Sequence, residues 1–154
     1  SQNPRISRST VAGEIIFNPF EIMIPDNIDI PHVQKEIAAV FHAYESALMS
    51  NDIAKLDLFF WDDKRTTRYG IADRQLGIEE LRRFRQNTPA PNFTRQLHNL
   101  RILTFGTDMA ISQVEFVRTD TRLRGFQTQT WVRFAEEWKI VSAHVSMIEW
   151  SENE

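Results

Sequence analysis

Apolar residues recur at steps of three and four positions between His32 and Met49. Because an α-helix completes a turn about every 3.6 residues, this spacing places them on one face of a helix. We therefore predict an amphipathic helix over this segment. The predicted apolar stripe consists of Val33, Ile37, Val40, Phe41, Tyr44 and Leu48.

The pattern that follows predicts two more helices and a run of strands. Asn51 or Asp52 can cap a short second helix that runs through Phe60. Helices come first and antiparallel strands follow, with one strand between the helices, so the expected fold class is α+β. The other predicted elements are a strand over 65–72, a helix over 78–86, a loop over 87–92, and strands over 94–105 and 109–119.

The C-terminal segment Arg124–Ser146 alternates like two strands joined by a tight turn. A two-residue turn would place four side chains on one face: Gln129, Trp131, Ser142 and His144. The opposite face would then carry Phe126, Val132, Phe134, Val141, Ala143, Val145 and Met147. The polar and aromatic face is either wet surface or the floor of a small-molecule pocket. A shift of one residue in the pairing would reverse this assignment.

The chain divides into one domain and two short ends. Residues 1–31 are predicted as an N-terminal extension or arm, 32–150 as a single domain, and 151–154 as a tail. The arm contains two apolar stretches, Glu14–Phe17 and Phe20–Ile24, each soon followed by a proline. We expect it to lie on another surface, in the same subunit or in a partner.

Charge and composition limit the possible functions. A net charge of −3 provides no basic excess for nucleic acid or an anionic membrane. The chain has no cysteine, which removes disulfides, thiol nucleophiles and thiolate metal sites and is compatible with a cytoplasmic location. No apolar run approaches the ~18 residues that a membrane span needs.

Two residues could carry chemistry because of where the pattern places them. Tyr44 belongs to the apolar stripe, so its hydroxyl needs a partner: either a backbone group in the core or a ligand in a cavity. Arg68 lies in the middle of a predicted strand and points to solvent, to a carboxylate, or inward. An inward Arg68 would be an unpaired planar cation suited to bidentate capture of a carboxylate.

The other polar candidates have structural and functional interpretations side by side. His144 can be a hydrogen-bonded strand residue, or can bind substrate or move a proton near neutral pH. Gln127 and Gln129 suit either a surface strand or a polar ligand. The four histidines share no metal-ligand spacing, so we predict no metal site. Arg82, Arg83 and Arg85 are expected to form a solvated helix face.

Three ordered blocks of sequence resemble the AtzH-like family of the nuclear transport factor 2-like (SnoaL-like) superfamily, which includes proteins of oxalurate and related nitrogen catabolism. The resemblance runs from about Val33 to Met147. The first block is 43–48 with 57–61. The second is 66–70 with 77–78 and 84–85, and the third is 127–133 with Trp138 and 143–146.

The resemblance implies a cone-shaped fold in which a curved, mostly antiparallel sheet is wrapped by three N-terminal helices and encloses a pocket. It implies a homodimer formed through the sheet and cofactor-independent hydrolysis of a small, carboxylated urea-type amide. The family's catalytic tyrosine and arginine would fall on Tyr44 and Arg68. Substrate contacts are expected from Gln127, Gln129, Trp131, His144 and Tyr69. The extension 1–31, which the family core lacks, could pack on a partner subunit.

Two alternatives stay open at this point. The same fold serves as a non-catalytic ligand-binding or oligomerisation module. An isomerase or dehydratase of the same superfamily would need an inward Asp or His as base, a role for which His144 is the candidate.

Overall fold

The computed structural model describes residues 8–11, 14–17 and 27–151. The described helices are α1 (Pro31–Met49), α2 (Ile53–Phe59) and α3 (Ile78–Asn87). The described strands are β1 (Arg8–Val11), β2 (Glu14–Phe17), β3 (Thr67–Tyr69), β4 (Arg74–Leu76), β5 (Arg95–Phe105), β6 (Met109–Arg118), β7 (Arg124–Phe134) and β8 (Glu137–Ile148). None of these helices is long and apolar enough to cross a membrane.

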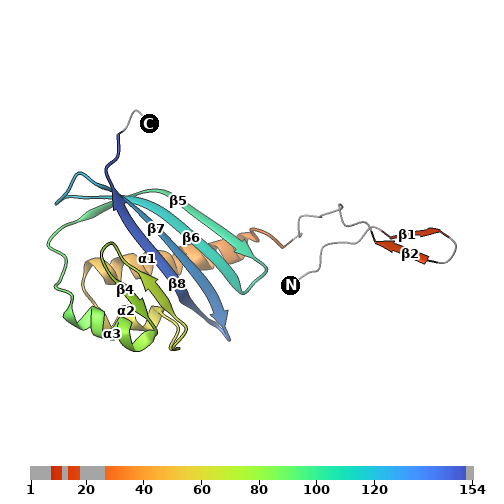
Figure 1. Ribbon diagram of the computed structural model, residues 1–154, viewed down its shortest axis with the longest axis horizontal. Helices are drawn as coiled ribbons and strands as arrows, with labels where there is room; N and C mark the ends of the chain where they lie inside the picture. The colour runs from red at the N-terminus through yellow and green to blue at the C-terminus, as the bar shows by residue number, and fades with distance from the viewer. Residues whose placement is uncertain (1–7, 12–13, 18–26, 152–154) are drawn as a thin grey trace.

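Strands β3 to β8 form one mixed sheet in the order β4-β3-β8-β7-β6-β5 (Figure 1). Neighbouring strands are antiparallel except β3 and β8, which run parallel. All three helices share one core with the sheet: Ile37, Leu56 and Leu81 are buried together with Trp131 and Ile140. The predicted α+β class is therefore confirmed, whereas the short strand β4 was not predicted.

Helix α1 forms where the apolar periodicity predicts it. Val33, Ile37, Phe41 and Tyr44 are buried, and the helix packs along β5 and β6. Pro31 stands in the first turn of the helix, where its missing N–H needs no partner. The stripe therefore fixes which side of α1 faces the sheet.

Helix α2 starts at the predicted cap. The carboxylate of Asp52 accepts the backbone N–H of Lys55, which satisfies a donor that the first helical turn leaves free.

The β7–β8 hairpin has the predicted tight turn, which contains two residues, and an unpredicted bulge. Phe134 pairs with Glu137 across the turn. Farther along, the successive residues Thr130 and Trp131 pair with β8 residues that are two positions apart, which leaves Val141 as an extra residue. A bulge of this kind shifts every later residue of the strand to the other face.

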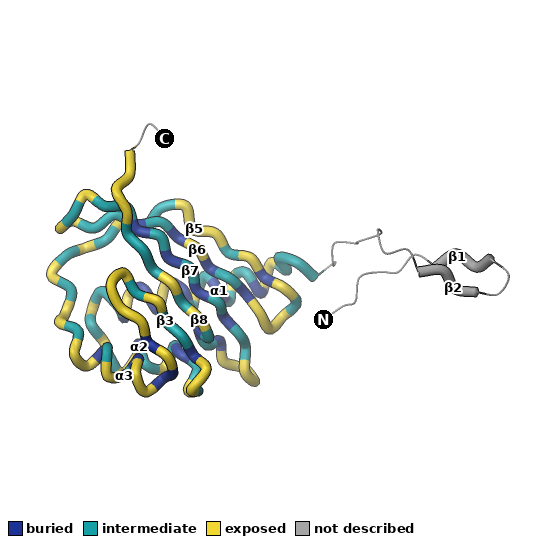
Figure 2. Tube along the Cα trace, in the orientation of Figure 1, coloured by how far each residue is buried: buried dark blue, intermediate teal, exposed yellow. Residues whose placement is uncertain are grey.

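The bulge overturns the predicted faces of the hairpin. Gln129 pairs with Ala143, so both lie on the helix side of the sheet with Trp131. Ser142 and His144 lie on the outer side and are exposed. The prediction that Gln129 and Trp131 share a face with Ser142 and His144 is therefore wrong. Buried and less buried positions alternate along β7 (Figure 2).

The outer face of the sheet carries exposed apolar side chains at one corner. The cross-strand register places Leu103, Phe105, Met109 and Phe134 on this face, and each is exposed. Phe126 and Val132 also lie on it, as predicted. Ala143 and Val145 do not, because the bulge turns them toward the helices.

Part of the predicted arm lies outside the described residues, namely 1–7, 12–13 and 18–26; of the tail, 152–154 do. Strands β1 and β2 pair with each other in a two-stranded antiparallel sheet. The last arm residues pack on β5 of the same subunit. Ile28 forms a bridge with Phe105, and the Asp29 carboxylate accepts the Thr104 backbone N–H.

We expect Gly125→Ala to lower the free energy of unfolding by about 1–3 kcal/mol, the usual cost of overpacking. A Cβ at this position would lie 2.1 Å from Cζ of the buried Phe116 ring, which crosses the glycine from β6. Urea denaturation of the variant and its parent measures the difference. Adding Phe116→Leu to Gly125→Ala should cost less than the sum of the two single changes; full additivity would contradict the steric explanation.

Candidate ligand-binding cavity

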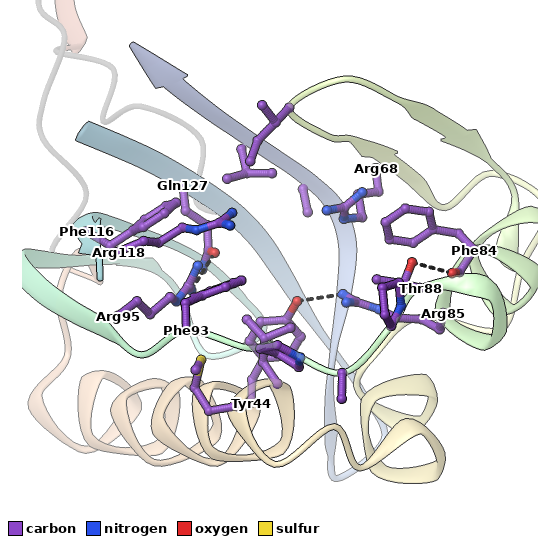
Figure 3. Close-up of a pocket in the computed structure, with 18 of the residues that line it drawn as sticks. Tyr44, Arg68, Phe84, Arg85, Thr88, Phe93, Arg95, Phe116, Arg118 and Gln127 are labelled. Atoms are coloured by element: carbon purple, nitrogen blue, oxygen red, sulfur yellow. Dashed lines mark hydrogen bonds between the residues drawn. The ribbon is translucent and has the colours of Figure 1, made fainter. Parts of the chain in front are cut away.

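A cavity of about 360 Å³ lies between α1, the end of α3, the loop 88–93 and the inner face of the sheet (Figure 3). Gln127 and Gln129 line it from β7, so the predicted pocket floor is present, although in a different register. Four arginines also line it: Arg68, Arg85, Arg95 and Arg118. The volume suits a small ligand, and the arginines suit one rich in acceptor atoms.

Tyr44 projects from α1 into the cavity and meets Arg85 of α3 (Figure 3). Arg85 Nη2 donates to Tyr44 Oη over 2.9 Å. Both residues are buried, with 4% and 5% of their surface exposed. The partner of the hydroxyl is therefore a side chain rather than a backbone group.

Arg68 lines the cavity from β3, and its side chain is 14% exposed. Its Nη1 donates to Asp73 Oδ1 at 2.8 Å and to Gln75 Oε1 at 3.0 Å. Its guanidinium lies 4.5 Å from the centre of the Phe84 ring. Of the three alternatives, Arg68 combines two: it points inward and it pairs with a carboxylate, so the unpaired inward cation is not what the structure shows.

Burial and a neighbouring positive charge both disfavour the charged form of Arg68. Burial, followed by the positive charge of Arg85, lowers the pKa of Arg68 from its ordinary value, while Tyr44 and Asp73 act in the opposite direction. Arginine stays protonated in proteins, so the cation persists at neutral pH. Two guanidinium groups therefore border the same end of the cavity, and the one of Arg68 is paired with Asp73.

A buried ion pair forms the opposite end of the cavity. Arg95 binds the Glu45 carboxylate through Nε, 3.0 Å from Oε2, and through Nη2 to Oε1. The same Nη2 donates to Gln127 Oε1 at 2.9 Å. The side chains of Arg95 and Glu45 are only 6% and 9% exposed, so their charges compensate each other away from water.

A short hydrogen-bond chain orients Gln129 on the cavity floor. Trp131 Nε1, which can only donate, bonds to Ser112 Oγ at 2.9 Å. The Ser112 hydroxyl then donates to Gln129 Oε1 at 3.2 Å. Because the side-chain oxygen of Gln129 accepts this hydrogen bond, its NH₂ group is left to donate to a ligand.

The structure brings together most of the predicted site residues. Tyr44, Arg68, Gln127, Gln129 and His144 all border the cavity. The exposed His144 ring, however, packs edge-on against Tyr69, with 5.7 Å between the ring centres. Tyr69 and Trp131 are not among the lining residues; Trp131 lies in the core behind Ser112.

Sequence reasoning missed two charged residues of this region. The prediction that Arg85 is solvated is wrong, because it is buried on α3 beside Tyr44. Its spacing from Ile78 and Leu81 places it on their buried face, which was a usable signal. Glu45 similarly falls on the buried side of α1. Among the described residues, no three His, Cys, Asp or Glu side chains gather as metal ligands would.

Comparison with known proteins identifies similar chains. The family model described as AtzH-like matches residues 26–151. A protein of unknown function from Pectobacterium atrosepticum is 45% identical, with a TM-score of 0.79 over 82% of this chain and 99% of the other. A cystatin-like fold protein from Burkholderia xenovorans is 42% identical, with a TM-score of 0.77 over 80% and 98%. No curated protein matches the chain.

The fold is shared more widely than the sequence. A nuclear transport factor 2-like superfamily protein from Salmonella enterica serovar Typhimurium is 19% identical, with a TM-score of 0.63 over 79% of this chain and 94% of the other. At this identity the likeness concerns the fold alone. The predicted cone-shaped, nuclear transport factor 2-like fold is thereby confirmed.

We expect Glu45→Gln to lower the free energy of unfolding by about 3 kcal/mol, because it leaves Arg95 buried without a counter-charge. Urea denaturation measures the loss. Replacing both partners, as Glu45→Met with Arg95→Met, should cost less than Glu45→Gln alone. A double variant that is less stable than the single variant would contradict this account.

Proposed function

Because the chain belongs to the AtzH-like family, we propose that it is an amidohydrolase acting on linear amide C–N bonds. The substrate is a small carboxylated urea-type compound of nitrogen catabolism, and the reaction needs no cofactor. The observation that carries the proposal is the convergence of Tyr44 and Arg68, from α1 and β3, on one cavity of small-molecule size.

The cavity residues suit the steps of such a hydrolysis. A water oxygen bonds to the carbonyl carbon, and the C–N bond breaks with its electron pair moving to nitrogen. The nitrogen takes up a proton, which gives an acid and an amine. Arg68 would anchor a substrate carboxylate and hold the charge that develops on the way. Tyr44 would polarise the carbonyl group or protonate the leaving nitrogen.

A non-catalytic ligand-binding or oligomerisation module is the second candidate. The ion pair between Arg68 and Asp73 favours it, because a paired arginine is also explained by a structural role. The isomerase or dehydratase alternative is less well supported. His144 borders the cavity, but its exposed ring packs against Tyr69 on the opposite face of the sheet from the floor residue Gln129.

We also propose that two copies of the chain pair through the outer face of the sheet. Leu103, Phe105, Met109 and Phe134 supply exposed apolar surface there, on the side away from the cavity. Packing of the extension 1–31 on the partner subunit stays a prediction.

Tyr44→Phe should lower kcat/KM for carboxylated ureas by at least about 100-fold, the usual contribution of a general acid. It removes the hydroxyl and leaves the buried ring in place. Product release can be followed by NMR, with Ser46→Ala as the control because it removes an exposed hydroxyl from the same helix. A folded Tyr44→Phe protein that works at the parental rate would contradict the proposal. A parent inactive on a full panel of such ureas would favour the non-catalytic module.

Met109→Glu should convert the dimer to monomers at concentrations where the parent remains paired, because it places a charge in the apolar outer corner. Sedimentation velocity distinguishes the two states. Leu58→Glu is the control, since Leu58 is more exposed than Met109 and lies on α2. An unchanged dimer in Met109→Glu, or a monomeric parent, would contradict pairing through this face.

A further inference from the structure

Arg85 differs from the other arginines of the cavity. Each of the other three forms an ion pair: Arg68 with Asp73, Arg95 with Glu45, and Arg118 with Asp120. No described carboxylate forms an ion pair with Arg85, whose hydrogen-bond partner is the Tyr44 hydroxyl. Arg85 thus brings a net positive charge to the cavity, which Arg68 does not.

Burial makes this charge costly. Arg85 is 5% exposed, and its Nε is buried without a hydrogen-bond partner among the described residues. The positive charge of Arg85 acts on Asp57, which is too far away to form an ion pair. Burial raises the pKa of Asp57, while Arg82 and Arg85 lower it. A desolvated cation normally pairs. One that borders an open cavity is available for an anion from solution.

The neighbours of Arg85 add hydrogen-bond donors. Arginine cannot accept, so Tyr44 Oη is the acceptor in their bond and the phenolic hydrogen is left over. No acceptor for this hydrogen is present among the described residues. Gln129 likewise keeps its NH₂ group free. The Tyr44 hydroxyl, the Gln129 amide and a cation without an ion-pair partner among the described residues therefore border the same space.

We propose that Arg85 binds the anionic group of the cavity's ligand and, through its hydrogen bond, turns the Tyr44 hydroxyl toward an acceptor oxygen of that ligand. The ligand class is a small planar anion that joins a carboxylate to a carbonyl group. The anchoring of the carboxylate, assigned above to Arg68, then passes to Arg85, and Arg68, which is paired with Asp73, contributes hydrogen bonds rather than net charge. The catalytic part of this inference rests on the proposed hydrolysis. In that reaction Tyr44 then donates a hydrogen bond or a proton and does not act as a base.

The test measures the affinity of oxamate, a small anion with a carboxylate next to an amide, by titration calorimetry at low ionic strength. Arg85→Gln should weaken binding by at least about tenfold, which corresponds to about 1.4 kcal/mol, because it removes a charged hydrogen-bond donor to the anion. Arg85→Lys should retain part of the affinity because it keeps the charge. Arg68→Gln should weaken binding less than Arg85→Gln does.

Arg83→Gln is the matched control, because it removes the same charge from an exposed position of the same helix and should leave affinity unchanged. Urea denaturation separates binding from structure: Arg85→Gln should be as stable as the parent or more stable, since it removes an uncompensated buried charge. A purely structural Arg85 would give a less stable variant.

The outcomes separate this inference from the proposed function. Oxamate binding that depends on Arg85, in a protein that hydrolyses no carboxylated urea, would support the inference and reject the hydrolysis. Binding that is lost in Arg68→Gln but kept in Arg85→Gln would overturn the inference and leave the hydrolysis standing. Absence of saturable oxamate binding to the parent protein would also overturn the inference.

Discussion

The pairing of β7 with β8 is the constraint on which the rest of the structure depends. The extra residue at Val141 lets Trp131 pair with Ile140 in the core while Gln129 pairs with Ala143 beside the cavity. Without the bulge, the second half of β8 would present its other side chains to the helices. The cavity floor and the exposed outer face both follow from this local irregularity.

The second organising feature is the balance of charge inside the fold. Tyr44 and Glu45 are neighbours on α1. Tyr44 bonds to Arg85 at one end of the cavity, and Glu45 bonds to Arg95 at the other. The negative charge of Glu45 balances the positive charge of Arg95, so this pair adds no net charge to that end. Tyr44 forms a hydrogen bond with Arg85 and leaves it without an ion-pair partner among the described residues. The asymmetry gives the cavity an end where an anion is favoured, which links the packing of α1 and α3 to the proposed chemistry.

Several local features could be predicted because neighbours in sequence decide them. The α1 stripe, the Asp52 cap and the tight hairpin turn depend on short-range geometry, and all three are present. The spacing of Arg85 from Leu81 indicates the buried face of α3, whereas the charge of an arginine favours solvent, so the two signals oppose each other. The strand β4 is three residues long and depends on pairing with β3, so its own pattern is too short to indicate it.

The sequence by itself determined the fold class, the family resemblance and the place of Tyr44 on the buried stripe of α1, because periodicity and local motifs carry that information. It left the direction of Arg68 open. Only the tertiary structure decided the face of His144, the neutralisation of Arg68 by Asp73 and the isolation of Arg85. Each of these depends on which segments meet in space. A one-residue bulge or an ion pair across a turn leaves no periodic trace in the chain, although it decides which side chains reach a ligand.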